Sequence, residues 1–463
     1  MLKKICFLSV LFLLAAAAYA QVEVTVYNQG YALVKDVRGV TVKKGIDTVS
    51  FADVASRIEP QSVLFKSLSG SFDILEQNYR YDLMNSRTIL NKLIGERVIL
   101  EDGAEGTLIS APGTDNASGA GTIVKKDDGN IVISPKIKET KKIPEGLIAR
   151  PTLSWLIESG ETKSHTCELS YITQGIGWNC DYVLLVNKDD TLGDINGWVT
   201  IDNKCGADFK NAQIALIAGD VERPAQPEPV YEVYDMDYAA EAKPMRNDFK
   251  EESFFEYHLY KLDRKSDVLN NESKQLALLS ANNVRVEKKL TYSPSQRSWW
   301  FVRDLDPETA KNGFATRTDV KVEVTMELLN SRENNMGMPL PKGKVKVYKL
   351  DSAGSQQFIG EDSIDHTPKD EKADLFLGSA FDVTGTYSMT DFKKPEKNVY
   401  METYKVTLAN HKDEDVVVDV YERVWGDWKV VSSDVEHKKI DAQTITFPVK
   451  IAADSTAELT YTI

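Results

Sequence analysis

Apolar and polar residues alternate along most of the chain, and this alternation predicts a mostly β protein. Between residues 168 and 221, four runs of β-branched or aromatic residues are separated by turn residues, at 168–173, 178–187, 198–203 and 212–218. Successive side chains of a strand point to opposite faces, so such runs are typical of consecutive antiparallel strands. We expect this stretch to lie at the centre of the fold.

The strands expected at 178–187 and 198–203 have one register that gathers apolar side chains on one face. It places Tyr182 opposite Asn203, with residues 188–197 as a surface loop between the strands. The second face is only partly polar. A two-layer β-sandwich with one mixed face fits this pattern.

The same register sets Cys180 opposite Cys205, which makes the two residues candidates for a cross-strand disulfide. Directly opposed residues in a non-hydrogen-bonded antiparallel pair have Cα atoms about 4.5 Å apart, at the short end of the range that a disulfide accepts. Cys167 is then left as a buried thiol in the neighbouring strand. The alternative is that all three thiols stay reduced and pack as small apolar side chains. The sequence leaves both interpretations open.

Residues 1–20 have the layout of a signal peptide. Lys3 and Lys4 precede an apolar run, and the motif Ala-Tyr-Ala precedes Gln21. The run is shorter than the roughly 20 residues needed to span a bilayer, and no second run of spanning length follows. We therefore expect an exported protein, periplasmic or extracellular, without a transmembrane segment after signal removal.

Residues 21–149 are expected to form an N-terminal β-domain with one short helix and a small barrel-like part. Ser86 can cap the helix, and Gly95 stands where a C-terminal left-handed residue belongs. The apolar face of this helix is expected to comprise Ile89, Leu90, Leu93 and Ile94.

Two immunoglobulin-like antiparallel β-sandwich domains are expected in the remaining chain. The central one comprises residues 150–221 and 253–335, and the C-terminal one residues 336–463. Residues 222–252 interrupt the first and are rich in Pro, Glu, Asp and Tyr, with few aliphatic residues. Such a segment cannot bury much apolar surface, so we expect an acidic exposed linker or loop that proteases cut first.

Charge narrows the range of partners. The net charge is −14, and it becomes −16 once Lys3 and Lys4 are lost with the signal peptide. This argues against nucleic acid or an anionic membrane as a partner. Of the four cysteines, Cys6 lies in the signal peptide, so an odd number remains. The chain is therefore not a disulfide scaffold of the small secreted kind.

Three residues are candidates for a binding surface or for chemistry. His366 is followed by Asp370 and Glu371, a combination that could bind a metal or transfer a proton, although its composition is that of a solvated turn. Trp299 and Trp300 point to opposite faces of an expected strand, so one ring is a candidate platform for sugars or proteins unless both faces are covered. No catalytic, cofactor-binding or metal-binding residue is assigned.

Six motifs carry a family resemblance: VYNQGYALVKDVR at 26–38, EQNYRYDL at 76–83, SYITQGIGWNCDYV at 170–183, GWVTIDNKCGADFKNAQIALIAGDV at 197–221, MGMPLPKGKVKVYKLD at 336–351 and FIGEDSIDHTPKDE at 358–371. With these motifs the chain resembles an exported bacterial family of unknown function related to the mucoidy-inhibitor-A-like domain. The resemblance implies an envelope-associated β-protein and transfers no catalytic residue.

These observations lead to one expected function and one alternative. The expected function is that of a noncatalytic, exported, envelope-associated β-protein with a binding or structural role. Envelope polysaccharide or another envelope protein is the expected partner. The alternative is a metal-assisted hydrolase that acts in the cell envelope through the loop around His366.

Overall fold

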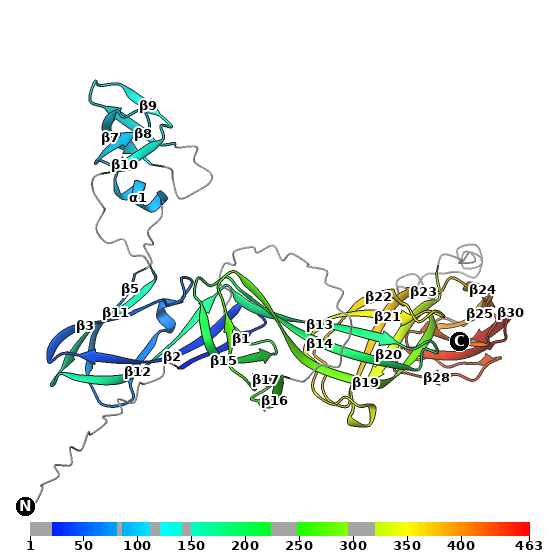
Figure 1. Ribbon diagram of the computed structural model, residues 1–463. Helices are drawn as coiled ribbons and strands as arrows, with labels where there is room; N and C mark the ends of the chain where they lie inside the picture. Colours follow the sequence, from blue (N-terminus) through cyan, green and yellow to red (C-terminus); the bar gives the residue numbers. More distant parts are fainter. Residues whose placement is uncertain (1–20, 81–85, 112–120, 141–149, 224–247, 295–319) are drawn as a thin grey trace, which may run out of the picture. The chain divides into compact units, whose positions relative to one another are not determined.

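The computed structural model describes residues 21–80, 86–111, 121–140, 150–223, 248–294 and 320–463 (Figure 1). The expected signal peptide, most of the expected linker, and Trp299 and Trp300 lie outside the described residues. The described chain is mostly β-strand, in several sheets with one short α-helix, as the alternation predicts. Unit 1 comprises the described residues of 1–178, 201–217 and 259–274, and unit 2 those of 179–200, 218–258 and 275–463.

The first half of the chain contains β1 (Gln21–Tyr27), β2 (Tyr31–Val42), β3 (Gly45–Ala52), the 3-10 helix η1 (Pro60–Ser62), β4 (Leu64–Ser67), β5 (Asp73–Arg80), α1 (Ser86–Lys92), β6 (Arg97–Leu100), β7 (Glu105–Ser110), β8 (Ile123–Lys126), β9 (Ile131–Ile133), β10 (Ile137–Thr140), β11 (Thr152–Ser159), β12 (Lys163–Gln174), β13 (Ile176–Val186), β14 (Leu192–Asn203) and β15 (Phe209–Ala218).

The second half contains β16 (Phe249–Phe254), β17 (Tyr257–Leu262), β18 (Ser266–Val268), β19 (Glu272–Tyr292), β20 (Glu323–Leu329), the 3-10 helix η3 (Arg332–Asn334), β21 (Gly343–Leu350), β22 (Gln356–Ile364), β23 (Lys372–Ser379), β24 (Val383–Glu396), β25 (Val399–Asn410), β26 (Val416–Arg423), β27 (Ser432–Ser433), β28 (Lys438–Lys439), β29 (Thr444–Ile451) and β30 (Ser455–Thr462). Strand β16 begins inside the segment 222–252 that was expected to be a linker.

Unit 1 contains two sheets that pack through aromatic side chains. One sheet includes the strands β15-β1-β2-β12-β4 in that order, and the other is β3-β11-β5. Phe65 of the first sheet stacks on Trp155 of the second, with ring centroids 4.1 Å apart, and lies 5.5 Å from Phe51. All three rings are buried, and each contributes roughly 2 kcal/mol through burial alone. The boundary expected at residue 150 falls inside unit 1, because β11 pairs with β3 and β5.

A five-stranded sheet is inserted between β5 and β11. Arg80 at the end of β5 pairs with Thr152 at the start of β11, so the chain leaves the three-stranded sheet and returns to it at the same point. The inserted strands lie in the order β10-β6-β7-β8-β9. They bury a core of Leu93, Val98, Leu100, Leu108 and Val124. The described strands are not closed into the expected barrel, because β9 and β10 each have a single neighbour among them.

The expected helix is present next to this sheet. It begins at Ser86, and Gly95 beyond its end has φ +89°, the left-handed conformation that favours glycine. Leu93 is buried as expected, but Ile94 is 50% exposed. The reason is that the helix ends at Lys92, so Ile94 no longer follows the helical period.

The register expected for β13 and β14 is wrong, because the turn between them is much shorter than expected. The side-chain oxygen of Asn187 accepts hydrogen bonds from the backbone N–H groups of Thr191 and Leu192, at 2.9 and 3.2 Å, and β14 begins at Leu192. Tyr182 therefore lies beside Gly197, where a Cβ atom would come within 3.0 Å of its ring. Asn203 is not the partner of Tyr182.

The disulfide expected from that register is absent, and the alternative of three reduced thiols describes the structure. Cys167, Cys180 and Cys205 are all free and buried. Cys180 pairs with Gly343 of β21, and the corrected register puts Val199 opposite it in β14. Cys205 lies beyond the end of β14, where its carbonyl accepts the backbone N–H groups of Ser56 and Arg57 at 2.9 and 3.3 Å.

Unit 2 also contains packed sheets. The larger follows the order β22-β21-β13-β14-β19-β26-β29-β28, with β20 and β23 attached beside β19, and the smaller is β24-β25-β30-β27. Phe447 of the larger sheet stacks on Tyr461 of the smaller, with ring centroids 4.6 Å apart, and Tyr404 lies 5.5 Å from Tyr461. The C-terminal strands beyond residue 336 thus join strands of the central region, because β21 pairs in parallel with β13.

Candidate functional site

The loop that carries His366 is held in place by buried polar contacts within unit 2. The side-chain amide of Asn330, which is fully buried, donates to the carbonyls of Thr367 and Pro368 at 3.4 and 3.0 Å. Leu340 and Thr367 exchange two backbone hydrogen bonds of 2.9 Å. His366 therefore lies on a fixed segment and not on a solvated turn.

The imidazole of His366 has one nitrogen occupied and one without a partner. The backbone N–H of Lys342 donates to Nδ1 at 3.1 Å, so Nδ1 carries a lone pair and Nε2 carries the proton of the neutral ring. Nε2 is buried and has no hydrogen-bond partner among the described residues. A buried N–H without a partner costs about 1–3 kcal/mol, so Nε2 is an unsatisfied donor inside the fold.

Burial and nearby charges act together on this ring. Burial lowers the pKa of His366, and the positive charge of Lys342 and the nearby His258 lower this pKa further, whereas Asp220 and Asp365 raise it. The Lys342 ammonium lies 3.6 Å from the Asp220 carboxylate. The neutral form, with its N–H on Nε2, is therefore the form that the site favours at neutral pH.

His258 belongs to a β-hairpin whose tip is apolar. Its Nδ1 lies 2.8 Å from the Glu251 carboxylate, so a contact joins strands β16 and β17. The two-residue turn of this hairpin begins at Phe255, which is 82% exposed, and the neighbouring Phe254 is 53% exposed. The Phe255 ring lies 6.0 Å from that of Tyr257.

Phe255 has a backbone conformation that does not suit its side chain. Its φ is +57°, in the left-handed region. Two-residue hairpin turns use Gly, Asn or Asp where φ is positive, and a bulky residue there costs about 1–2 kcal/mol. Because the ring is exposed, no burial of apolar surface offsets this backbone strain. Neither the backbone nor hydration explains a phenylalanine at this position, which makes the hairpin tip a candidate contact surface.

The sequence located His366 but missed the hairpin. Phe254 and Phe255 read as the start of a strand, FFEYHLYKL, because consecutive aromatic residues have β propensity. The sequence did contain one indication that these rings are exposed. Glu252 and Glu256 lie on either side of Phe254 and Phe255, and acidic residues are rarely buried in a core.

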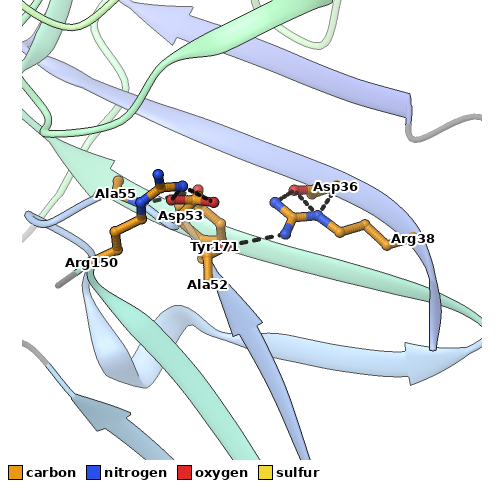
Figure 2. A network of polar contacts seen from close by, with 7 residues as sticks. All are labelled: Asp36, Arg38, Ala52, Asp53, Ala55, Arg150 and Tyr171. Carbon is orange, nitrogen blue, oxygen red and sulfur yellow. Dashed lines mark hydrogen bonds and ion pairs between the residues drawn. The ribbon is translucent and has the colours of Figure 1, made fainter. Parts of the chain in front are cut away.

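A second polar network lies in unit 1 and is structural (Figure 2). Arg38 binds the buried carboxylate of Asp36 through Nε and Nη2 and donates to the carbonyl of Ala52 at 3.0 Å. Arg150 binds both carboxylate oxygens of Asp53 at 2.8 and 3.0 Å. Each carboxylate is thus paired with an arginine of the chain itself, and Arg38 holds Ala52 against β2.

Tyr171 completes this network from β12. Its hydroxyl accepts the backbone N–H of Ala55 at 3.4 Å, and burial raises the pKa of the phenol. A neutral, buried phenol that accepts a hydrogen bond from a backbone amide has a structural role. We therefore place no chemistry in this part of unit 1.

The described residues contain no group of three or more His, Cys, Asp or Glu side chains arranged to hold a metal ion. In the same residues, no helix has the length and apolar character required to cross a bilayer.

No protein-family model matches this chain, and no curated protein matches it. The resemblance to the exported family therefore stays a prediction.

Proposed function

We propose that this chain is a noncatalytic, exported, envelope-associated protein that binds another envelope protein through the tip of the β16–β17 hairpin. The observation that carries the proposal is Phe255, which is 82% exposed in a strained backbone conformation. A strained backbone conformation persists only where the surrounding structure enforces it. Such conformations are found mostly at functional sites, including ligand contacts. Phe254 beside it extends the apolar surface.

The charges around the tip indicate the chemistry of the partner. Glu252 and Glu256 flank the two phenylalanines in the sequence, and Glu251 is bound to His258. An apolar pocket with basic residues at its rim complements this arrangement, because opposite charges at a rim guide association and the aromatic side chains supply the buried contact. An anionic lipid surface does not complement it.

His258 is joined to Glu251 across the hairpin, which ties its two strands together behind the tip. Nε2 of His366 is buried, so it offers no contact to a partner. The Nδ1 lone pair of His366 is already used by Lys342, so the metal-assisted hydrolase is not carried forward as a second candidate.

The test is complementation of a deletion strain, read as sensitivity of the envelope to detergent. Phe255→Gly should restore the protein level but not the resistance. Phe381→Gly is the matched control, because Phe381 is 93% exposed and lies outside the hairpin. Full resistance with Phe255→Gly would remove the hairpin from the function, and a deletion strain with a normal envelope would remove the envelope role.

A photoreactive amino acid at position 255 then identifies the class of partner. A protein adduct that is absent when the same group stands at position 381 supports the proposal. An adduct that glycosidases digest would show that the partner is a polysaccharide instead.

A further inference from the structure

The inserted five-stranded sheet has one edge that lacks the usual protection against pairing. Among the described residues, strand β9 is at the end of the sheet and pairs with β8 alone. Its side chains Ile131 and Ile133 are 65% and 73% exposed. The opposite edge, β10, carries the exposed ion pair of Lys138 and Glu139, and charges of this kind discourage edge-to-edge association.

At two residues of β9 the backbone N–H and C=O groups point away from β8. The N–H of Lys126 donates to the carbonyl of Asn130, and the N–H of Ser134 donates to the carbonyl of Thr122, at 2.8 and 2.7 Å. Hydrogen-bonded pairs alternate along an antiparallel ladder, so Val132 also bonds toward β8. The N–H and C=O groups of Ile131 and Ile133 therefore point toward the open edge.

The outer face of the same strands is apolar at one end, whereas the exposed Lys125 lies opposite Ile131 at the other end. Ile123 is the partner of Ile133 in the neighbouring strand and lies on the same face. Ile109 of β7, next to Ser110, which pairs with Ile123, is 48% exposed. Residues on the inner face, Leu108 and Val124, are buried in the core. An apolar stripe of Ile109, Ile123 and Ile133 thus leads from β7 to the edge strand β9.

We propose that β9 pairs in antiparallel orientation with β9 of a second copy of this chain. The strand is self-complementary: a two-fold axis at Val132 sets Ile131 of one copy opposite Ile133 of the other. Both residues face the edge with their N–H and C=O groups, so about four hydrogen bonds form across the axis. The isoleucines of the two copies become neighbours on one face, and β9 itself contains no charged residue, whereas Lys125 of β8 lies beside Ile131 in each copy. The contact is small, so the dimer is weak and depends on concentration.

Sedimentation velocity of the chain from Gln21, at increasing concentration, tests this pairing. We expect a shift from one copy to two copies, and a loss of this shift in Ile131→Lys/Ile133→Lys, where like charges face each other. Ile46→Lys is the matched control, because Ile46 is 64% exposed on β3, an edge strand of another sheet. The control should dimerise like the unchanged protein.

Hydrogen exchange of the unchanged protein provides a readout that does not depend on a variant folding. The amides of Ile131 and Ile133 should exchange more slowly at high concentration than at low concentration. A protein that stays a single copy at all concentrations overturns the proposal, and so does a dimer that survives in the double variant. Phe255→Gly should leave the dimer unchanged, which separates this test from that of the hairpin.

Discussion

At the scale of single residues, His366 makes stability depend on pH. Its pKa in the folded protein is below the ordinary value of 6.5, so the unfolded chain takes up this proton at a higher pH than the folded chain does. The unfolding free energy should therefore fall as the pH drops through 6.5, and the loss should be complete once the pH is below the folded pKa.

His366→Asn tests this dependence. The side-chain oxygen of Asn can replace Nδ1 as the acceptor for the N–H of Lys342, but Asn does not titrate. Denaturant unfolding between about pH 8 and about pH 5 should show a smaller loss of stability in the variant than in the unchanged protein. Equal losses would show that the other histidines account for the effect.

The three buried thiols give a second prediction at this scale. Burial raises the pKa of Cys167 to about 11, that of Cys180 to about 12 and that of Cys205 to about 11. Thiolates are the reactive form, so an alkylating reagent should label none of the three in the folded protein. After unfolding without a reductant all three should react. Labelling of Cys167 alone would instead support the disulfide between Cys180 and Cys205.

Residue-level predictions from the sequence succeeded where the residue type alone decides the outcome. Gly95 adopts the left-handed conformation and Leu93 is buried, both as expected. The environment of His366 could not be derived, because Asp220, His258 and Lys342 are distant in sequence and meet it only through the fold.

At the scale of secondary-structure elements, the β16–β17 hairpin should become more stable when its strain is removed. Glycine adopts φ +57° without a steric penalty, whereas its greater freedom in the unfolded chain costs part of the gain. Phe255→Gly should therefore raise the unfolding free energy by about 0.5–1 kcal/mol, measured by denaturant unfolding. Phe381→Gly, where φ is not positive, should not. A loss of stability in Phe255→Gly would mean that the ring packs within the fold.

Strands could be predicted from the alternation, but strand partners could not. The register of β13 and β14 depends on Asn187, whose side chain closes a short turn, and on Asp190, which adopts φ +57°. The hydrophobic pattern alone also allowed the expected register, because Asn203 and Gly197, the expected and observed partners of Tyr182, are an even number of residues apart, and an even shift leaves the same side chains on the buried face. Local turn chemistry, not the pattern, decided the outcome.

At the scale of the whole molecule, the five-stranded insertion should be dispensable for the folding of the rest. Arg80 and Thr152 are directly paired, so a two-residue Asn-Gly turn can replace residues 81–151. We expect the shortened protein to unfold cooperatively and to keep the near-ultraviolet circular dichroism of the buried Trp155. Loss of that signal would show that the insertion supports the sandwich. The exposed ion pair of Arg150 and Asp53 is lost as well, but such pairs contribute little.

The sequence could not reveal how the chain is divided. Composition separates segments that follow one another, whereas both units are assembled from three stretches of chain each. Sheets made from distant stretches leave no mark in local composition, which is why the boundary expected at residue 150 falls within a unit.

The parallel pairing of β1 with β15 has a consequence for the order of folding. Glu23 of β1 lies beside Gln213 of β15, so one edge of β1 has no partner until almost half of the chain has been made. Contacts between such distant residues slow folding, and an unpaired strand edge invites aggregation meanwhile. A nascent chain that stops before β15 should therefore depend on a chaperone that covers this edge.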